Sequence, residues 1–240
     1  MKLIVCKNYD EISEVAANIL ADVMKANHAC VLGLATGSTP VGMYKKLIEK
    51  NRAGEIDFSA VTTVNLDEYY PIAPDNDQSY RYFMNENLFN HVNIDKTRTF
   101  VPDGMAADPA AACDAYEKIV ASVGAADVQV LGIGQNGHIG FNEPDAALDV
   151  KTHVTGLTES TIKANARFFA SEADVPTKAL TMGIGTILNA KKIVILANGA
   201  AKHAAVAKML EGKLDTSCPA SMLNLHSDVT VICDEAAYNG

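Results

Sequence analysis

The sequence has no surplus of positive charge, because its 20 Lys and Arg are outnumbered by 29 Asp and Glu, which leaves a net charge of −9. This acidic balance argues against nucleic acid or an anionic membrane as the main partner. No apolar run approaches the length that spans a bilayer. The first strand-like residues meet Lys7 and Asp10 too soon for the core of a signal peptide. We therefore expect a soluble, cytoplasmic protein with no nucleic-acid and no membrane partner.

Close cysteine pairs and clusters of metal ligands are also lacking. The five cysteines form no Cys-x-x-Cys motif, and such a scattered, odd set suits a reducing compartment in which most thiols are small core residues. The six histidines show no metal-ligand spacing. We therefore expect neither a disulfide framework nor a histidine metal site.

The chain contains instead a regular alternation of strand-like and helix-like segments. Its 240 residues, 48% of them hydrophobic, are enough to bury the core of one large domain. Runs rich in apolar or β-branched residues are typical of strands in a sheet covered by helices on both faces, and they lie at residues 29–34, 61–66, 128–133 and 193–197. The pattern predicts one α/β domain over residues 1–240, with a single doubly wound, mostly parallel sheet and helices on both faces. A lid is expected at about residues 145–175.

Several helices have recognisable boundaries. Asp10 can cap a helix that runs to about Asn27, and Ser79 opens another that runs to about Asn90. Residues 160–170 also have a helical pattern.

The strand at residues 128–133 leads into a glycine-rich loop with acid–base side chains. Asn136, His138 and Glu143 lie within ten residues of the strand's end. In open α/β sheets, ligands bind outside the carboxyl ends of the strands, so this is a favourable place for proton-transfer chemistry. The alternative is a glycine-rich turn in which His138 only caps backbone carbonyls.

A second loop follows the strand at residues 29–34. Gly37, Ser38 and Thr39 precede Pro40, which suits the first turn of a helix, so free N–H groups and hydroxyls gather at a positive helix end. Such a loop can hold a phosphate, although an ordinary Ser/Thr cap explains this segment equally well. The loop matches neither the nucleotide P-loop nor the dinucleotide fingerprint.

Three further candidates are charged residues with competing explanations. Asp67 and Glu68 follow the strand at residues 61–66, and because neighbours in an extended chain point in opposite directions, at most one faces a site. A solvated acidic pair is the alternative. Arg167 could be an exposed arginine in a surface ion pair. Lys202 opposes the dipole of the helix it begins, which suggests a bound anion, but it could also be a snorkelling surface lysine.

The run Gly-Gln-Asn-Gly-His-Ile-Gly-Phe-Asn-Glu-Pro at residues 134–144 resembles the signature loop of glucosamine-6-phosphate deaminases. Other segments from about residue 30 to about residue 235 are similar to the same family. The resemblance implies the Rossmann-like fold that these deaminases share with 6-phosphogluconolactonases. It also implies conversion of glucosamine 6-phosphate to fructose 6-phosphate and ammonia, in amino-sugar catabolism. Each step of that conversion is a proton transfer, so no cofactor is expected.

The resemblance implies a role for each candidate residue. His138 would open the sugar ring, oriented by Asn136 and Glu143, and Asp67 would be the base that moves a proton from C2 to C1. Many family members have Asp where this chain has Asn136, which cannot stabilise an imidazolium with a full charge. The substrate phosphate would be held by five residues: Gly37, Ser38, Thr39, Arg167 and Lys202.

The deaminase interpretation has two alternatives, and the resemblance also bears on regulation and assembly. A 6-phosphogluconolactonase is expected to have a Ser-Leu-Phe-Pro type run in place of residues 141–144, and a sugar-phosphate-sensing regulator should add a basic helix-turn-helix, which is not visible here. The positions aligned with an effector-binding Arg and Lys of allosteric relatives hold His153 and Thr155. We therefore expect no activation by N-acetylglucosamine 6-phosphate, and a monomer or small homo-oligomer.

Overall fold

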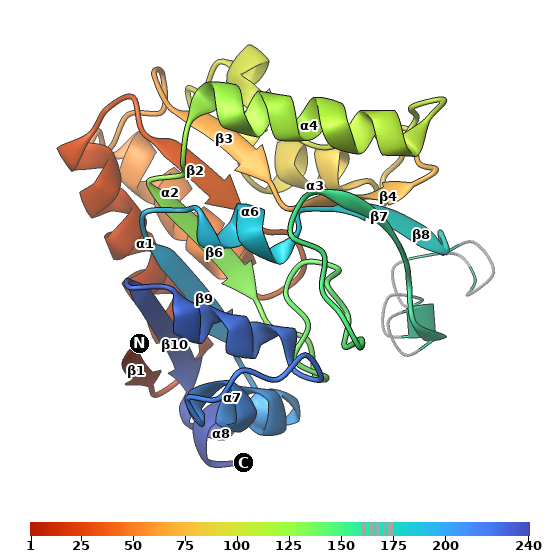
Figure 1. Ribbon diagram of the computed structural model, residues 1–240. Coiled ribbons are helices and arrows are strands. Elements are labelled where there is room, and N and C mark those ends of the chain that lie inside the picture. The colour runs from red at the N-terminus through yellow and green to blue at the C-terminus, as the bar shows by residue number, and fades with distance from the viewer. Residues whose placement is uncertain (160–161, 164–165, 167–168, 170, 172–174) are drawn as a thin grey trace.

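A seven-stranded parallel sheet lies at the centre of the protein (Figure 1). The computed structural model describes residues 1–159, 162, 163, 166, 169, 171 and 175–240. The strand order is β1-β10-β9-β6-β2-β3-β5, and every neighbouring pair in it is parallel. The strands are β1 (Lys2–Cys6), β2 (Val31–Leu34), β3 (Thr62–Asn65), β5 (Thr99–Phe100), β6 (Val128–Gly132), β9 (Ile193–Ala197) and β10 (Val229–Asp234).

Helices cover both faces of this sheet because the chain winds across it in two directions. From β1 through β2 to β3 the connections are α1 (Tyr9–Ala26) and α2 (Val41–Arg52), which pack against each other. From β5 through β6 and β9 to β10 the chain runs back the other way, through α4 (Pro109–Val123), α6 (Ile184–Leu188) and α7 (His203–Leu210). Right-handed crossovers in opposite directions place the two groups of helices on opposite faces. The expected doubly wound α/β fold is confirmed.

The order of the strands reverses between β2 and β6, which are neighbours in the sheet. The chain leaves β2 towards β3 on one side and leaves β6 towards β9 on the other. Such a switch point opens a crevice at the carboxyl ends of the strands, where ligands of this fold class bind. The two loops that the sequence singles out follow β2 and β6, the two strands at this switch point.

A second sheet has three antiparallel strands, β4 (Asp67–Tyr70), β8 (Lys178–Thr181) and β7 (His153–Gly156), and lies at the right of the view (Figure 1). Only Leu66 separates β4 from β3, and the carbonyl oxygen of Leu66 accepts a hydrogen bond from the N–H of Met182 at 2.7 Å. Tyr69 and Phe141 belong to its small core, separate from the large one. Residues 67–70, which we expected only to follow the strand at residues 61–66, thus form a strand of their own.

Several expected boundaries differ from the structure. Helix α1 is capped by Asn8, whose side chain accepts the N–H of Glu11 at 3.0 Å, and not by Asp10. Helix α3 (Tyr80–Asn87) begins after the cap residue Ser79 as expected but ends three residues early. Part of the expected lid is strand β7, while the lid itself stays a prediction. The helix expected at residues 160–170 includes positions outside the described residues.

The remaining elements are short. They are the 3-10 helices η1 (Phe89–His91), η2 (Lys96–Arg98), η5 (Ala200–Lys202) and η6 (Pro219–Leu225), and the terminal helix α8 (Glu235–Asn239). All five cysteines are buried free thiols. Within the described ranges, none of the helices has the length and apolar character required to cross a bilayer.

Tyr116 fastens α4 to the end of β3, just before the chain enters the second sheet. Its hydroxyl lies 2.6 Å from the carbonyl oxygen of Asn65 and 3.2 Å from that of Phe100, and the residue is buried. We predict that Tyr116→Phe lowers the free energy of unfolding by about 1–3 kcal/mol, because a buried acceptor loses its donor. Urea unfolding measures this. Tyr238→Phe, at an exposed tyrosine of α8, is the control and should change stability by less than about 0.5 kcal/mol. Equal stability of both variants would contradict the prediction.

Candidate active site

The loop after β6 is folded tightly around His138. The N–H of Gly134 donates to the carbonyl oxygen of His138 at 2.9 Å, and the N–H of Gly137 donates to that of Gly134 at 3.0 Å. A side chain at residue 134 would place its Cβ 2.4 Å from the imidazole ring, so this position must be glycine for the ring to lie there. The amide of Asn142 donates to the carbonyl oxygens of Ile139 and Met182, at 2.9 and 2.8 Å, which ties the loop to the second sheet. These hydrogen bonds hold the backbone of the loop, and with it the imidazole of His138, in one position.

Glu143 lies between His138 and Asn136. Its Oε2 is 3.4 Å from His138 Nδ1 and accepts a hydrogen bond from Asn136 Nδ2 at 2.6 Å. The first distance is that of an ion pair; among the described residues Nδ1 has no hydrogen-bond partner of good geometry. The Glu143 side chain is only 8% exposed and that of His138 is 24% exposed. The largely buried carboxylate of Glu143 can therefore stabilise a protonated His138 by its negative charge. The amide of Asn136 is neutral and cannot do so.

Asp67 is buried at the first position of β4, beside this loop. It is 5% exposed and stands opposite Thr181 of β8. A Cβ at Gly140 would lie 3.5 Å from Asp67 Oδ2 and 2.9 Å from Thr181 Oγ1, so the loop approaches the carboxylate closely at a glycine. Burial, and secondly the charge of Glu68, raise the pKa of Asp67 to about 8. A carboxylate with such a pKa is a strong proton acceptor once ionised.

Glu68 points away from the loop, as expected for neighbours in a strand. It is 2% exposed, and its carboxylate accepts the backbone N–H groups of Tyr69, Tyr80 and Arg81 at 2.9, 2.8 and 2.9 Å. Burial raises the pKa of Glu68 to about 7, although the three N–H groups and Arg81 act in the opposite direction. The alternative of a solvated acidic pair is therefore wrong, because both carboxylates are inside the protein.

The loop after β2 is joined to the loop after β9. Gly37 has a φ of +90°, a backbone conformation that favours glycine. The hydroxyl of Thr39 donates to Asn198 Oδ1 at 3.1 Å. Asn198 follows β9 and begins the segment that leads to Lys202, the last residue of η5. The structure thus links the region of Gly37, Ser38 and Thr39 to the loop carrying Lys202. Arg167 lies outside the described residues.

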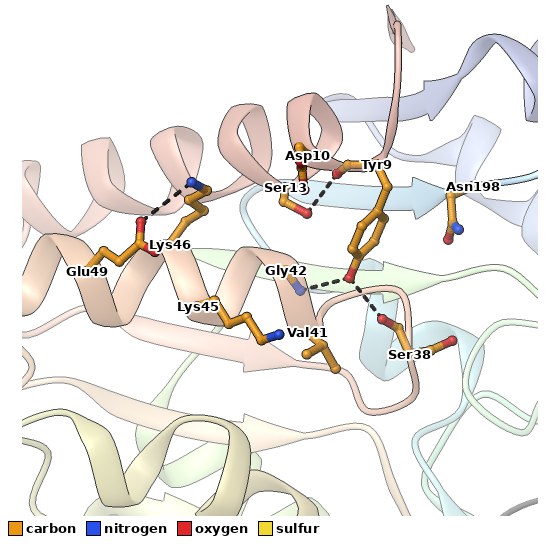
Figure 2. Close-up of a pocket in the computed structure, with 10 residues that line it drawn as sticks. All are labelled: Tyr9, Asp10, Ser13, Ser38, Val41, Gly42, Lys45, Lys46, Glu49 and Asn198. Atoms are coloured by element: carbon orange, nitrogen blue, oxygen red, sulfur yellow. Dashed lines mark hydrogen bonds and ion pairs between the residues drawn. The ribbon is translucent and has the colours of Figure 1, made fainter.

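Tyr9 supports the loop after β2 and lies above it in the view of Figure 2. Its hydroxyl lies 3.0 Å from the carbonyl oxygens of Ser38 and of Thr39, and it accepts the N–H of Gly42 at 2.8 Å. Neither Tyr9 nor Asn198 was identified from the sequence. Asn198 could have been predicted, because it is a polar residue directly after a buried strand. Tyr9 could not, because nothing in the sequence distinguishes it from other residues at the start of an amphipathic helix.

A cavity of about 530 Å³ is lined by residues of α1, α2 and the loop after β2 (Figure 2). Ser38 and Asn198 line it together with Tyr9 and Lys45. Asp67 and His138 are not among its lining residues. We therefore assign the candidate chemistry to the strand ends around Asp67 and His138, and not to this cavity.

The raised pKa of Asp67 predicts a stability effect with a definite sign. The folded protein binds this proton more tightly than an unfolded chain, in which the pKa is near 3.8. Ionisation of Asp67 therefore lowers the free energy of unfolding as the pH rises from about 4 to about 8. Asp67→Asn should gain stability relative to the wild type across that range, as measured by urea unfolding at several pH values. The exposed Asp22→Asn is the control. A difference for Asp67→Asn that does not grow with pH would contradict the burial of an ionisable carboxylate.

Comparisons with known proteins identify the family of this chain. The family described as glucosamine-6-phosphate isomerases/6-phosphogluconolactonase matches residues 7–232. A glucosamine-6-phosphate deaminase of Clostridium perfringens is 58% identical over 99% of this chain and 98% of its own. One from Clostridium beijerinckii is 57% identical over 100% and 99% of the two chains.

Solved structures of proteins with these names have the same fold as this chain. A monomeric glucosamine-6-phosphate deaminase has a TM-score of 0.97 and 49% identity, covering 99% of this chain and 98% of that one. The 6-phosphogluconolactonase of Trypanosoma brucei has a TM-score of 0.80 at 20% identity, covering 98% and 97%, which shows a shared fold. The match over nearly the whole length, together with more than half of all residues identical to curated relatives, shows that the chain belongs to the glucosamine-6-phosphate isomerase/6-phosphogluconolactonase family.

Proposed function

We propose that this protein is a glucosamine-6-phosphate deaminase, which converts glucosamine 6-phosphate to fructose 6-phosphate and ammonia. The observation that carries the proposal is the buried carboxylate of Asp67 beside the loop that holds the pair His138 and Glu143. Relatives of that name, 54–58% identical over 96–100% of this chain, support it. The reaction would belong to amino-sugar catabolism, including the degradation of N-acetylglucosamine, in the cytoplasm.

Ring opening is the first step that the residues support. His138 would take the proton of the anomeric hydroxyl and return a proton to the ring oxygen, so that the pyranose opens to the aldehyde. The imidazolium that forms in between has the carboxylate of Glu143 at 3.4 Å from Nδ1. Asn136, which donates to the same carboxylate oxygen, would keep Glu143 in place. In this chain Glu143 would therefore supply the charge that Asn136 lacks.

Isomerisation is the step for Asp67. The carboxylate would take the C2 proton of the open sugar and deliver it to C1, which turns the aldose amine into a fructosimine. Water then hydrolyses the C=N bond, with release of ammonia and fructose 6-phosphate. Burial of Asp67 favours this step, because a carboxylate out of water is a stronger base.

The substrate phosphate would bind at the other end of the crevice. Gly37, Ser38 and Thr39 precede α2, where free N–H groups and the helix dipole favour an anion. Lys202 would add a positive charge from the loop after β9, and Arg167 remains a proposed second charge. Anchoring the phosphate holds the sugar in register for the small carboxylate of Asp67.

Lactone hydrolysis is the second candidate, since 6-phosphogluconolactonases share the fold at 18–21% identity. Residues 141–144 favour the deaminase, because they are Phe-Asn-Glu-Pro and not a Ser-Leu-Phe-Pro type run. Phe141 is buried and stacks on Tyr80, with ring centroids 6.0 Å apart and planes at 8°. A lactonase type of loop would replace this aromatic contact. The deciding experiment is an assay of ammonia and fructose 6-phosphate from glucosamine 6-phosphate, with 6-phosphogluconolactone as parallel substrate. Lactone hydrolysis without ammonia release would refute the proposal.

Lys202→Ala should weaken substrate binding while leaving the pH profile unchanged, because a phosphate anchor takes no part in proton transfer. Loss of one charged hydrogen bond corresponds to about 1.5–3 kcal/mol, or roughly a tenfold or greater rise in KM. Steady-state kinetics measures both quantities. Lys213→Ala, at a lysine whose side chain is 80% exposed, is the matched control. An unchanged KM for Lys202→Ala would argue against its role.

We further propose that the enzyme is a monomer or small homo-oligomer without activation by N-acetylglucosamine 6-phosphate. A monomeric relative supports this. His153 already contacts the carbonyl oxygen of Lys151 at 2.9 Å and lies 3.6 Å from Asp149, an acidic neighbour that disfavours a phosphate. Initial rates should follow a hyperbola in substrate with and without that effector. Sigmoidal curves that the effector makes hyperbolic would mean that a regulatory site exists.

A further inference from the structure

Glu68 is a buried carboxylate for which the proposed reaction has no use. It is 2% exposed and belongs to β4, while two of its three N–H donors, those of Tyr80 and Arg81, are the first residues of α3. The side chain of Ser79 already caps that helix by accepting the N–H of Tyr82 at 3.0 Å. Glu68 therefore adds a second connection, from the strand that carries Asp67 to the start of α3.

The charge of Glu68 also needs an explanation, because an ionised carboxylate is costly to bury. The three N–H groups stabilise the anion, and the nearby guanidinium of Arg81 adds a positive charge. Arg81 is itself held by hydrogen bonds to the side chain and carbonyl oxygen of Thr99, both at 2.8 Å. These donors keep Glu68 ionised more readily than Asp67, for which no hydrogen-bond donor occurs among the described residues.

Two tyrosines on the helices near the two carboxylates are uncharged at neutral pH. Tyr80 of α3 and Tyr116 of α4 face Asp67, and burial raises the pKa of both hydroxyls. The partner of Asp67 on β8 is Thr181, which does not titrate. Among the charged side chains of the described residues, that of Glu68 is the one that raises the pKa of Asp67, in addition to burial, while Arg81 acts on Glu68. The ion pair of His138 and Glu143 belongs to the loop after β6.

We propose that Glu68 is a positioning residue for the base: it fixes β4 against α3 and places a negative charge next to the carboxylate of Asp67, which keeps that carboxylate a strong proton acceptor. The inference rests on the proposed deaminase reaction. The role of Glu68 is indirect, because its side chain points away from the loop of His138. The expected consequence concerns the protonation of Asp67, and not substrate binding.

The test is the pH profile of kcat/KM for ammonia release, compared between the wild type, Glu68→Gln and Glu68→Asp. The acid limb reports ionisation of the base in the free enzyme. Removing the negative charge in Glu68→Gln should make Asp67 easier to ionise, so the limb should move to lower pH by about 1 unit. The plateau value of kcat should fall because the base is weaker, while KM stays the same. Glu68→Asp keeps the charge, and its limb should stay at the wild-type position.

Two results would overturn the inference. One is an acid limb that does not move in Glu68→Gln. The other is a limb that moves equally in Glu68→Asp, since looser packing alone would then be the cause. If Glu68→Gln does not fold, carboxyl carbon-13 NMR of the wild type decides, because Asp67 must titrate in two steps coupled to Glu68. A single uncoupled step refutes the role of Glu68. A wild type that releases no ammonia refutes the proposed function instead, so the two failures are distinguishable.

Discussion

The chain leaves the parallel sheet at Leu66 and pairs with β8 one residue later, and this change of sheet buries the carboxylate of Asp67. The hydrogen bond from Met182 to Leu66 and the register of Asp67 opposite Thr181 hold the junction. The loop after β6 depends on the same junction, because Asn142 donates to the carbonyl oxygen of Met182 and the N–H of Phe141 donates to Thr181 Oγ1 at 3.1 Å. One set of backbone contacts therefore brings the proposed base and the loop of His138 together.

Such a site lowers the stability of the fold that carries it. Two carboxylates lie inside the protein, and ionising them at neutral pH works against folding. The surrounding contacts offset part of this effect. Tyr69, Tyr80 and Phe141 pack with centroids 4.8 to 6.0 Å apart, and aromatic pairs of this kind contribute about 0.5–1.5 kcal/mol each beyond burial. We interpret the small aromatic core as the support that allows Asp67 to remain out of water.

The parts of the fold that could be predicted were those with a strong local pattern. The buried runs that became β2, β6 and β9 have no other good explanation, and the loops after them followed from the rule that sites lie at strand ends. The second sheet could not be predicted, because β4 and β7 are short, rich in polar residues and stabilised only by partners distant in sequence. Burial of Asp67 and Glu68 depends on that sheet, so the sequence alone favoured a solvated pair. The support of Ser38 by Tyr9 is likewise a tertiary contact without a local signal.

At this junction, we infer, Asp67 moves a proton between C2 and C1 of glucosamine 6-phosphate. The most direct measurement is the reaction in deuterium oxide, with the position of the isotope read by NMR in the sugar. The wild type should release ammonia and form fructose 6-phosphate that carries deuterium at C1 to the extent that the base exchanges with solvent. Asp67→Asn, with an unchanged fold, should give neither ammonia nor exchange at C2. An Asp67→Asn variant that turns over or exchanges at nearly the wild-type rate would contradict the account, because another group would then be the base.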